Sequence, residues 1–238
     1  MKSGLLALFF SISFPLLGAE DATLTKLTKA FKDTAPPIQQ KVERKGDKTL
    51  EVESLLEIAG DLASFEMVAK DLPHWRDWAF EKINNPGEGQ SDYIVQLHDA
   101  VSKAPEQMTA LFSFNLPFFG KNRTRSFHIQ QSKIPAGYRI QAESLLNTNS
   151  ALKSAKVVAD AYLATTKKNM LWVAIHATVV FKSWLIYEAL PEKVVLRELG
   201  DRLSTIVANF ETESTRRKRG GPGLPARPMP PAESLNED

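Results

Sequence analysis

The side chains that most often carry out catalysis or bind metals are scattered in this sequence. Its four histidines, His74, His98, His128 and His176, lack the spacing of two histidines on one helical turn that metal motifs use. Each is interpreted as a surface histidine or as one satisfied in the core. His128 is kept as the exception, because it follows Phe127 in a predicted central strand and imidazole can act as acid or base near neutral pH. No catalytic residue, metal ligand or cofactor is predicted.

Other catalytic patterns are missing from the sequence as well. The glycines form neither a phosphate-binding loop nor a dinucleotide motif, and the nucleophile elbow Gly-x-Ser-x-Gly does not occur. A glycosidase would need two convergent carboxylates, whereas Glu51, Glu53 and Glu57 alternate along a segment where they are expected to face water. Nucleotide-binding and hydrolase functions are therefore disfavoured.

A set of aromatic and aliphatic side chains lies at positions that can line an apolar pocket. The candidate ligand-binding residues are Trp78, Phe112, Phe114, Phe127, Tyr138, Ile140, Leu199, Leu203 and Ile206. A mostly apolar pocket with a few polar groups suits a lipid or another hydrophobic small molecule. The residues alone leave open whether they line such a pocket or fill an ordinary core.

Three arginines on predicted neighbouring strands allow two interpretations. Arg123, Arg125 and Arg139 either meet an acidic head group or pair with Glu143 inside a cavity, or they form a row on the solvent face. The solvent-facing row is favoured, because an unpaired buried arginine is costly.

Two elements near the C-terminus must position several of these residues. Both faces of the segment 170–181 are mostly apolar, so this strand is expected to be covered on both sides or to line a cavity. An apolar stripe at helical spacing follows over 185–210. It repeats at Leu196, Leu199, Leu203, Ile206, Val207 and Phe210. The stripe predicts a long helix that lies on a sheet.

The preceding segments alternate in the manner of antiparallel strands. Alternation over 50–58 predicts a half-exposed strand, and Asp61 is expected to cap a helix over 62–70. A second short turn begins at Pro73 and contains Trp75 and Trp78. Further strands are predicted at 80–83, 93–97, 108–115, 123–131, 138–146, 157–165 and 170–181. The fold class is therefore α+β, with an antiparallel sheet, two short helices after the first strand and one long C-terminal helix.

Three stretches carry a resemblance to a known family. The first strand and helix are followed by His-Trp-Arg-Asp-Trp at 74–78, then Pro-Phe-Phe-Gly-Lys-Asn-Arg at 117–123, and a strand at 138–144 that ends in serine. In this order they resemble the START-like superfamily, also called the SRPBCC or Bet v 1-like helix-grip fold, and within it START-type lipid-binding domains. The resemblance covers 50–210. It implies a curved sheet that grips the last helix, with a hydrophobic cavity beneath that helix.

Two positions depart from the START pattern. Thr124 and Arg125 follow Asn-Arg, where many START domains have an acidic residue. The Asp-Pro-Gly-Gly-type turn before the last helix is replaced by residues 182–186, and only Leu190 and Pro191 resemble its end. The family's ligand-binding residues are therefore not transferred to this chain.

Composition limits the other classes of function. The net charge of +2 disfavours a nucleic-acid-binding protein, and 43% hydrophobic residues suffice for a substantial core. The absence of cysteine excludes disulfides, thiolate metal sites and cysteine nucleophiles. Stability is therefore expected to come from packing.

The ends of the chain are expected to lie outside the domain at 38–213. Residues 1–19 have the basic start, apolar run and small final residues of a signal peptide, with an uncleaved membrane anchor as the alternative. Residues 20–37 predict a short helix, for packing or for the membrane surface, and a linker. Residues 214–238 predict a disordered basic, Pro- and Gly-rich tail, which is either a solvated linker or a contact for anionic lipid or an acidic partner.

Together these features predict an exported protein, periplasmic if bacterial and otherwise secreted. It is expected to bind or carry a lipid or other hydrophobic molecule without catalysis, with transient membrane contact and no nucleic-acid partner. A cyclase or aromatase on the same fold, using His128, is one alternative. A cell-envelope interaction module that uses the Pro-rich tail is another. The oligomeric state is not predicted.

Overall fold

The described part of the chain folds into one curved antiparallel sheet crossed by a long helix. The structure, a computed structural model, describes residues 38–71, 74–79, 94–104, 107–116, 120–145, 152–164 and 169–221. The predicted signal peptide, the segment 20–37, the strand at 80–83 and the tail beyond residue 221 lie outside these ranges. No helix of the described residues is long and apolar enough to cross a bilayer.

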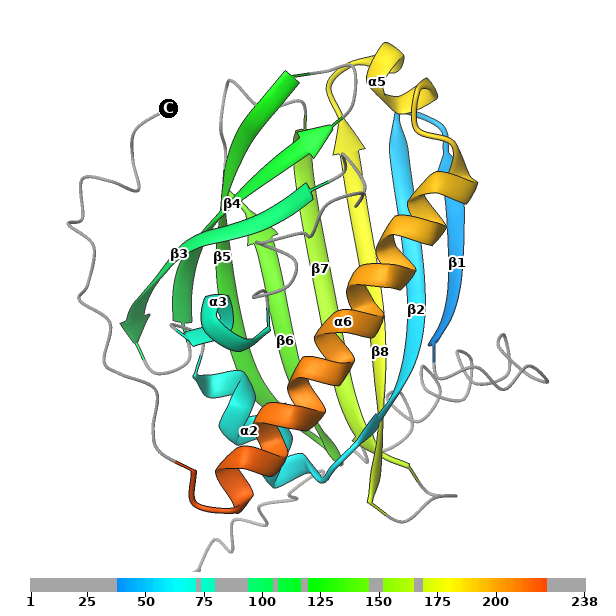
Figure 1. The fold of residues 1–238 in the computed structure, drawn as a ribbon. Helices are drawn as coiled ribbons and strands as arrows, with labels where there is room; N and C mark the ends of the chain where they lie inside the picture. Colours follow the sequence, from blue (N-terminus) through cyan, green and yellow to red (C-terminus); the bar gives the residue numbers. More distant parts are fainter. Residues whose placement is uncertain are drawn as a thin grey trace, which may run out of the picture.

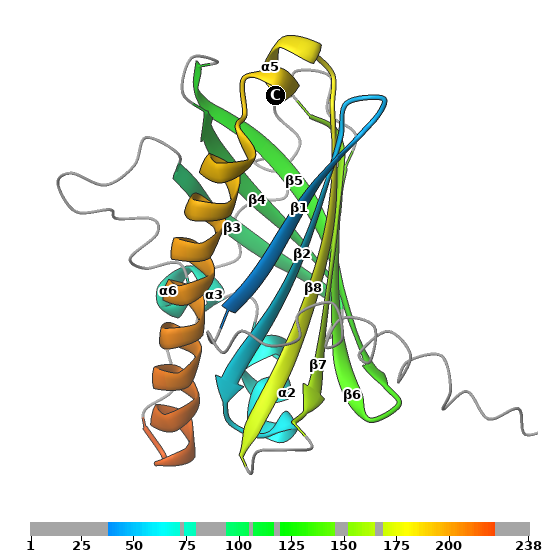
Figure 2. The ribbon, with the colours of Figure 1, turned by 90° about the vertical axis from the view of Figure 1, so that its right-hand side faces the viewer.

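Eight strands are described, and they form a single sheet in the order β1-β2-β8-β7-β6-β5-β4-β3. Their bounds are β1 (Ile38–Lys45), β2 (Thr49–Ala59), β3 (Ile94–Ala104), β4 (Gln107–Leu116), β5 (Gly120–Ile134), β6 (Gly137–Ser144), β7 (Leu152–Leu163) and β8 (Met170–Phe181). The helices are α2 (Leu62–Lys70), α3 (Trp75–Trp78), α5 (Trp184–Glu188) and α6 (Glu192–Lys218). Helix α6 runs diagonally across one face of the sheet (Figures 1 and 2). The predicted α+β class is confirmed, and the two short helices predicted after the first strand follow β2, which is the second strand of the sheet in chain order.

Strand alternation decides which face of the sheet meets α6. In β2, Leu50, Val52, Leu56 and Ile58 are buried, and Glu53 on the opposite face lies across from the exposed His176 of β8. We call the side that carries the buried β2 residues the inner face. Side chains alternate between the two faces along a strand, and directly paired residues of antiparallel strands share a face, so Val179 and Leu171 of β8, opposite Leu50 and Ile58, also lie on the inner face. The expected half-exposed strand with outward glutamates is therefore confirmed.

Strand β1 is an element that the sequence pattern missed. It pairs with β2 over its whole length, from Ile38 opposite Leu56 to Lys45 opposite Thr49. Apolar residues are sparse in it, and lysine, glutamate and arginine dominate its second half. Charged residues are typical of edge strands, because they discourage pairing with other chains. An edge strand thus gives a weak hydrophobic signal.

The single helix predicted over 185–210 is two helices. Helix α5 ends at Glu188, and α6 begins after Pro191, whose backbone (φ −64°, ψ 137°) is extended. Proline cannot donate an intrahelical hydrogen bond, and it disfavours helical backbone in the preceding residue. Helix α6 then continues to Lys218, so residues 214–218 belong to this helix rather than to a disordered tail.

The predicted cap of α2 is confirmed. Asp61 is extended and its carboxylate accepts hydrogen bonds from the backbone N–H and the hydroxyl of Ser64, both at 2.8 Å. The cap satisfies a backbone donor that the first helical turn leaves free. It fixes where α2 leaves the end of β2, and so places the helix across the end of the sheet.

Candidate functional site

One end of the inner face is closed by tight packing. Helices α2 and α6 meet there, with the Phe65 and Phe210 ring centroids 5.3 Å apart, and Trp78 of α3 lies edge-on to Phe210 at 6.3 Å. Val68 of α2 and Leu171 of β8 have no exposed surface. This end is therefore a filled core, and it seals the sheet against the helix.

The middle of the inner face is packed less completely. The apolar residues there are half-buried: Ile140, Ala142, Val157, Ala159, Ile175, Ala177 and Val179. Three of them are alanines, one on each of the neighbouring strands: Ala142 on β6, Ala159 on β7 and Ala177 on β8. Val157 of β7 lies between Ala142 and Ala177 and pairs with both. Helix α6 packs mainly on β1, β2, α2 and α3. The described residues thus leave a partly exposed strip of alanine, valine and isoleucine side chains on the inner face, and we call it the central strip.

A buried hydrogen-bond chain borders the central strip. The Tyr138 hydroxyl donates to Gln131 Oε1 at 2.7 Å, and Gln131 Nε2 donates to the Ala69 carbonyl at 2.9 Å. Both side chains are buried, at 3% and 4% exposed. Gln131 thus ties the sheet to the last turn of α2 and satisfies the polar end of Tyr138.

Three neutral polar atoms of the inner side have no hydrogen-bond partner among the described residues. They are Ser54 Oγ, Gln40 Nε2 and Trp78 Nε1. Ser54 is fully buried and lies opposite Gln40 across the β1–β2 ladder. Gly200 of α6 lies against Gln40, since a Cβ there would stand 3.0 Å from Gln40 Oε1. Buried polar groups are nearly always hydrogen-bonded, so these atoms are exceptions within the described part of the chain.

Neither Ser54 nor Gln40 is among the predicted ligand-binding residues. Ser54 does carry a signal in the sequence, because it is the one polar residue in the series Leu50, Val52, Ser54, Leu56, Ile58. Gln40 carries none, since the strand that contains it was not predicted.

Most of the described ligand-binding candidates belong to the packed core, and Ile140 is the one that also lies in the central strip. Tyr138 and Leu203 are buried in the cluster at the closed end, and Trp78, Ile140 and Leu199 pack against it. Phe127 is buried in a separate cluster with Ile129 and Ala155. Ile206 is half-buried and belongs to none of the described clusters. Phe112 and Phe114 lie in β4, but their side chains are outside the described part. The assignment of all nine residues to a ligand site stays a prediction.

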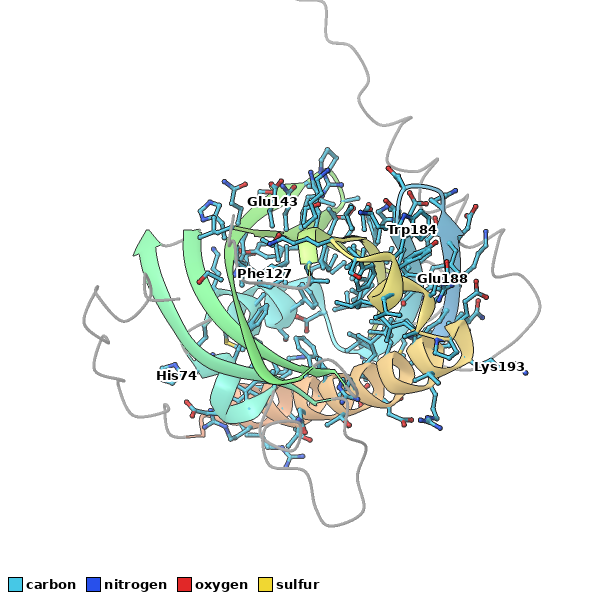
Figure 3. The ribbon with its side chains drawn as sticks, turned by 90° about the horizontal axis from the view of Figure 1, so that it is seen from above. His74, Phe127, Glu143, Trp184, Glu188 and Lys193 are labelled. Carbon is cyan, nitrogen blue, oxygen red and sulfur yellow. The ribbon has the colours of Figure 1, made fainter. Side chains whose placement is uncertain are left out.

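His128 does not lie on the inner face. Its neighbours Phe127 and Ile129 are buried inside, so alternation directs His128 outward, beside Glu143 of β6. Figure 3 shows Phe127 on the inner side of the sheet and Glu143 on the outer side. The suggestion that His128 acts as a pocket acid or base is therefore wrong.

His74 and His176 do not converge with His128, and the side chain of His98 is outside the described part. His176 is exposed on the outer face, 3.9 Å from Glu53, and His74 contacts Asp71 at 2.5 Å near the end of α2. No group of three potential metal ligands occurs among the residues that the structure describes.

Arg139 lies on the outer face and not in a cavity. Its guanidinium binds Asp160 of β7 through two hydrogen bonds of 2.7 Å, and its side chain is 37% exposed. The interpretation that Arg139 lies inside a cavity is therefore wrong, and the solvent-facing interpretation is confirmed for this residue. The side chains of Arg123 and Arg125 are outside the described part.

The basic cluster at the end of α6 fastens this helix to α2. Glu213 accepts hydrogen bonds from Arg216 and Arg217, Arg217 also pairs with Asp71, and Lys218 binds Asp61 at 2.8 Å. The hydrogen bond from Lys218, followed by those from Ser64, lowers the pKa of Asp61 to about 2. The bond from Arg216 lowers the pKa of the Glu213 carboxyl. Three of the four basic residues at 216–219 therefore have partners inside the fold.

Comparisons with known proteins agree with this architecture. No family model matches the chain, and no curated protein matches its sequence. A fragment of a STAR-related lipid transfer protein from Xanthomonas axonopodis is 15% identical, with a TM-score of 0.51 over 75% of this chain and 96% of that one. Human STARD10 is 12% identical, with a TM-score of 0.51 over 84% of this chain and 82% of that one. The curved sheet, the two short helices and the long closing helix therefore give this chain the START-like helix-grip fold.

Proposed function

We propose that this protein binds a lipid or another hydrophobic small molecule, without covalent chemistry, between the central strip and α6. The central strip carries the proposal, because its apolar side chains stay partly exposed in the middle of a sheet whose end is tightly packed. Burial of such surface by an apolar ligand contributes about 25 cal/mol per Å². The proteins of similar fold include one named as a lipid transfer protein, which supports the same class of ligand.

The unpartnered atoms of Ser54 and Gln40 suggest the polarity of the ligand's head. Both groups are neutral, and together they offer one hydroxyl and one amide donor. A neutral hydroxyl, carbonyl or amide group fits such partners better than an ion, whose burial without a countercharge is costly. We therefore expect a ligand with a large apolar body and an uncharged polar group. Export, inferred from residues 1–19, stays a prediction.

Filling the central strip tests the proposal. Ala159→Phe places a large ring beside Ile140 and Ile175, its partners on the neighbouring strands. If the strip lines a ligand compartment, this variant keeps its free energy of unfolding within about 1 kcal/mol and loses binding of a fluorescent fatty acid by about tenfold or more. The control is Val158→Phe, the neighbouring residue on the outer face, which should bind the probe as the wild type does.

Two results would contradict the proposal. One is a wild-type protein that takes up neither the fluorescent fatty acid nor fluorescent phosphatidylcholine and carries no lipid in native mass spectrometry. The other is a loss of about 1–3 kcal/mol of stability in Ala159→Phe with unchanged probe binding, as overpacking of a filled core would produce.

A further inference from the structure

Helix α5 presents two large apolar side chains to solvent. Trp184 is 54% exposed and Leu185 is 72% exposed, the highest values among the large apolar residues of the described part. They are consecutive, and they lie at the end of the sheet opposite α2 (Figure 1). Figure 3 looks onto this end, with Trp184 and Glu188 on α5 and Lys193 where α6 begins. Single exposed apolar residues are common, but an adjacent pair at a molecular tip needs an explanation.

The opposite side of α5 is anchored to the sheet. Tyr187 is buried, donates its hydroxyl to the Lys45 carbonyl at 2.9 Å and packs against Phe181 with ring centroids 6.0 Å apart. The Arg44 guanidinium lies 4.5 Å from the centroid of the Tyr187 ring. Ser183 caps the first turn by accepting a hydrogen bond from the Leu185 N–H at 3.2 Å. The two exposed side chains are therefore held outward by a fixed helix.

The charges around α5 fit an anionic surface. Lys182 and Lys193 are exposed on either side of the helix, and Lys48 is tied to this end through its hydrogen bond to the Lys182 carbonyl. The carboxylates of Glu188 and Glu192 lie 3.9 and 4.0 Å from Arg44, whose single positive charge offsets one of their two negative charges. Tryptophan is enriched at the membrane interface, and exposed lysines attract anionic lipid head groups.

We propose that α5 docks this protein on anionic lipid bilayers, with Trp184 and Leu185 inserted at the head-group level and Lys182 and Lys193 on the lipid phosphates. Two side chains offer far less area than the roughly 1,200 to 2,000 Å² of a stable protein interface. Shallow insertion into a bilayer needs no larger patch, because apolar burial and lysine attraction add together. A bilayer is therefore the occupant that this surface fits, in preference to a second copy of the chain.

Vesicle binding tests the docking surface. The full chain and the form lacking residues 1–19 would be floated with vesicles of phosphatidylcholine, with and without phosphatidylserine. The double variant Trp184→Ser with Leu185→Ser should reduce the partition coefficient of the shorter form by about tenfold or more. The matched control is Met67→Ser with Leu163→Ser, which removes exposed apolar side chains from α2 and the end of β7 and should bind like the wild type.

The charge contribution is tested separately. Lys182→Glu with Lys193→Glu should weaken binding roughly fivefold or more per lysine on vesicles with phosphatidylserine, and little on phosphatidylcholine alone. The single change Leu185→Ser, which keeps the contact of Trp184 with Tyr187, serves if the double variant does not fold.

Three outcomes would overturn docking through α5. They are equal vesicle binding by wild type and the Trp184 and Leu185 variants, an equal loss in the control, and a dimer in light scattering that these variants abolish. Docking and the proposed ligand binding fail separately. Uptake of a soluble fatty-acid probe measures ligand binding at the central strip, whereas vesicle flotation measures membrane binding through α5.

Discussion

At the scale of single residues, Gln131 links two layers of the molecule. Its amide accepts from the Tyr138 hydroxyl and donates to the last turn of α2, and no water is needed to satisfy either bond. A buried donor or acceptor that loses its partner is destabilising by more than the net contribution of the bond itself. The Gln131 side chain is therefore expected to matter more than its size suggests.

Replacement of Gln131 by leucine should lower the free energy of unfolding by about 1–3 kcal/mol, because the Tyr138 hydroxyl and the Ala69 carbonyl both lose their partner. Urea unfolding followed by far-UV circular dichroism measures the effect. Gln130→Leu is the matched control, since Gln130 is the exposed neighbour on the outer face. Equal stabilities of the two variants would show that the buried chain is not important for stability.

At the scale of elements, the last turns of α6 hold the closed end together. Glu213 is 5% exposed and shares its carboxylate between Arg216 and Arg217, while Arg217 and Lys218 reach the two ends of α2 at Asp71 and Asp61. Removing either partner of a buried ion pair destabilises the fold, because the remaining charge is left uncompensated. These contacts explain why the helix continues to Lys218.

Glu213→Ala should destabilise the protein by about 2–3 kcal/mol, because it leaves two partly buried guanidinium groups without their shared partner. Asp201→Ala, an exposed carboxylate of the same helix, is the control and should change stability by less than about 0.5 kcal/mol. Chemical denaturation measures both. If the two variants lose the same stability, the ion pairs do not fasten α6 to α2.

At the scale of the whole molecule, the paired carboxylates determine the response to acid. The pKa of Asp61 is lowered to about 2 by Lys218 and Ser64, whereas an aspartate of the unfolded chain titrates near pH 4. Because the folded pKa lies below the unfolded one, this stabilisation is complete above about pH 4 and is lost as the pH falls toward 2. The pKa of Glu213 is lowered as well, chiefly by its bond from Arg216, and acts in the same direction.

The free energy of unfolding should therefore be nearly constant from pH 7 to about 5 and should fall progressively between about pH 4 and 2. Asp61→Asn should make this fall shallower, since asparagine still caps α2 but does not titrate in this range. Urea unfolding at a series of pH values measures both curves. A variant with the same acid dependence as the wild type would assign the effect to other groups.

The amino-acid sequence determined the order of most elements. Period-two alternation marked the described strands other than β1, Asp61 marked the start of α2, and the apolar stripe that includes Leu203 and Phe210 marked the closing helix. These signals are local, because the spacing of apolar residues along a few neighbouring positions follows the period of the strand or helix. The resemblance to START-like domains followed from their order and is confirmed at the level of the fold.

Only the tertiary structure decided which residues meet. Strand pairing directed His128 to the outer face and joined Arg139 to Asp160. It also placed Gln40 beside Ser54, and α6 brought Gly200 against Gln40, although Gln40 is 14 residues from Ser54 and 160 residues from Gly200 in the chain. Pro191 divided the last apolar stripe and left α5 as a separate helix with Trp184 outward. A strand register shift of one residue exchanges the faces, and distant contacts depend on the packing of whole elements. The sequence pattern therefore predicted the fold, and tertiary packing decided its central strip and its exposed tip.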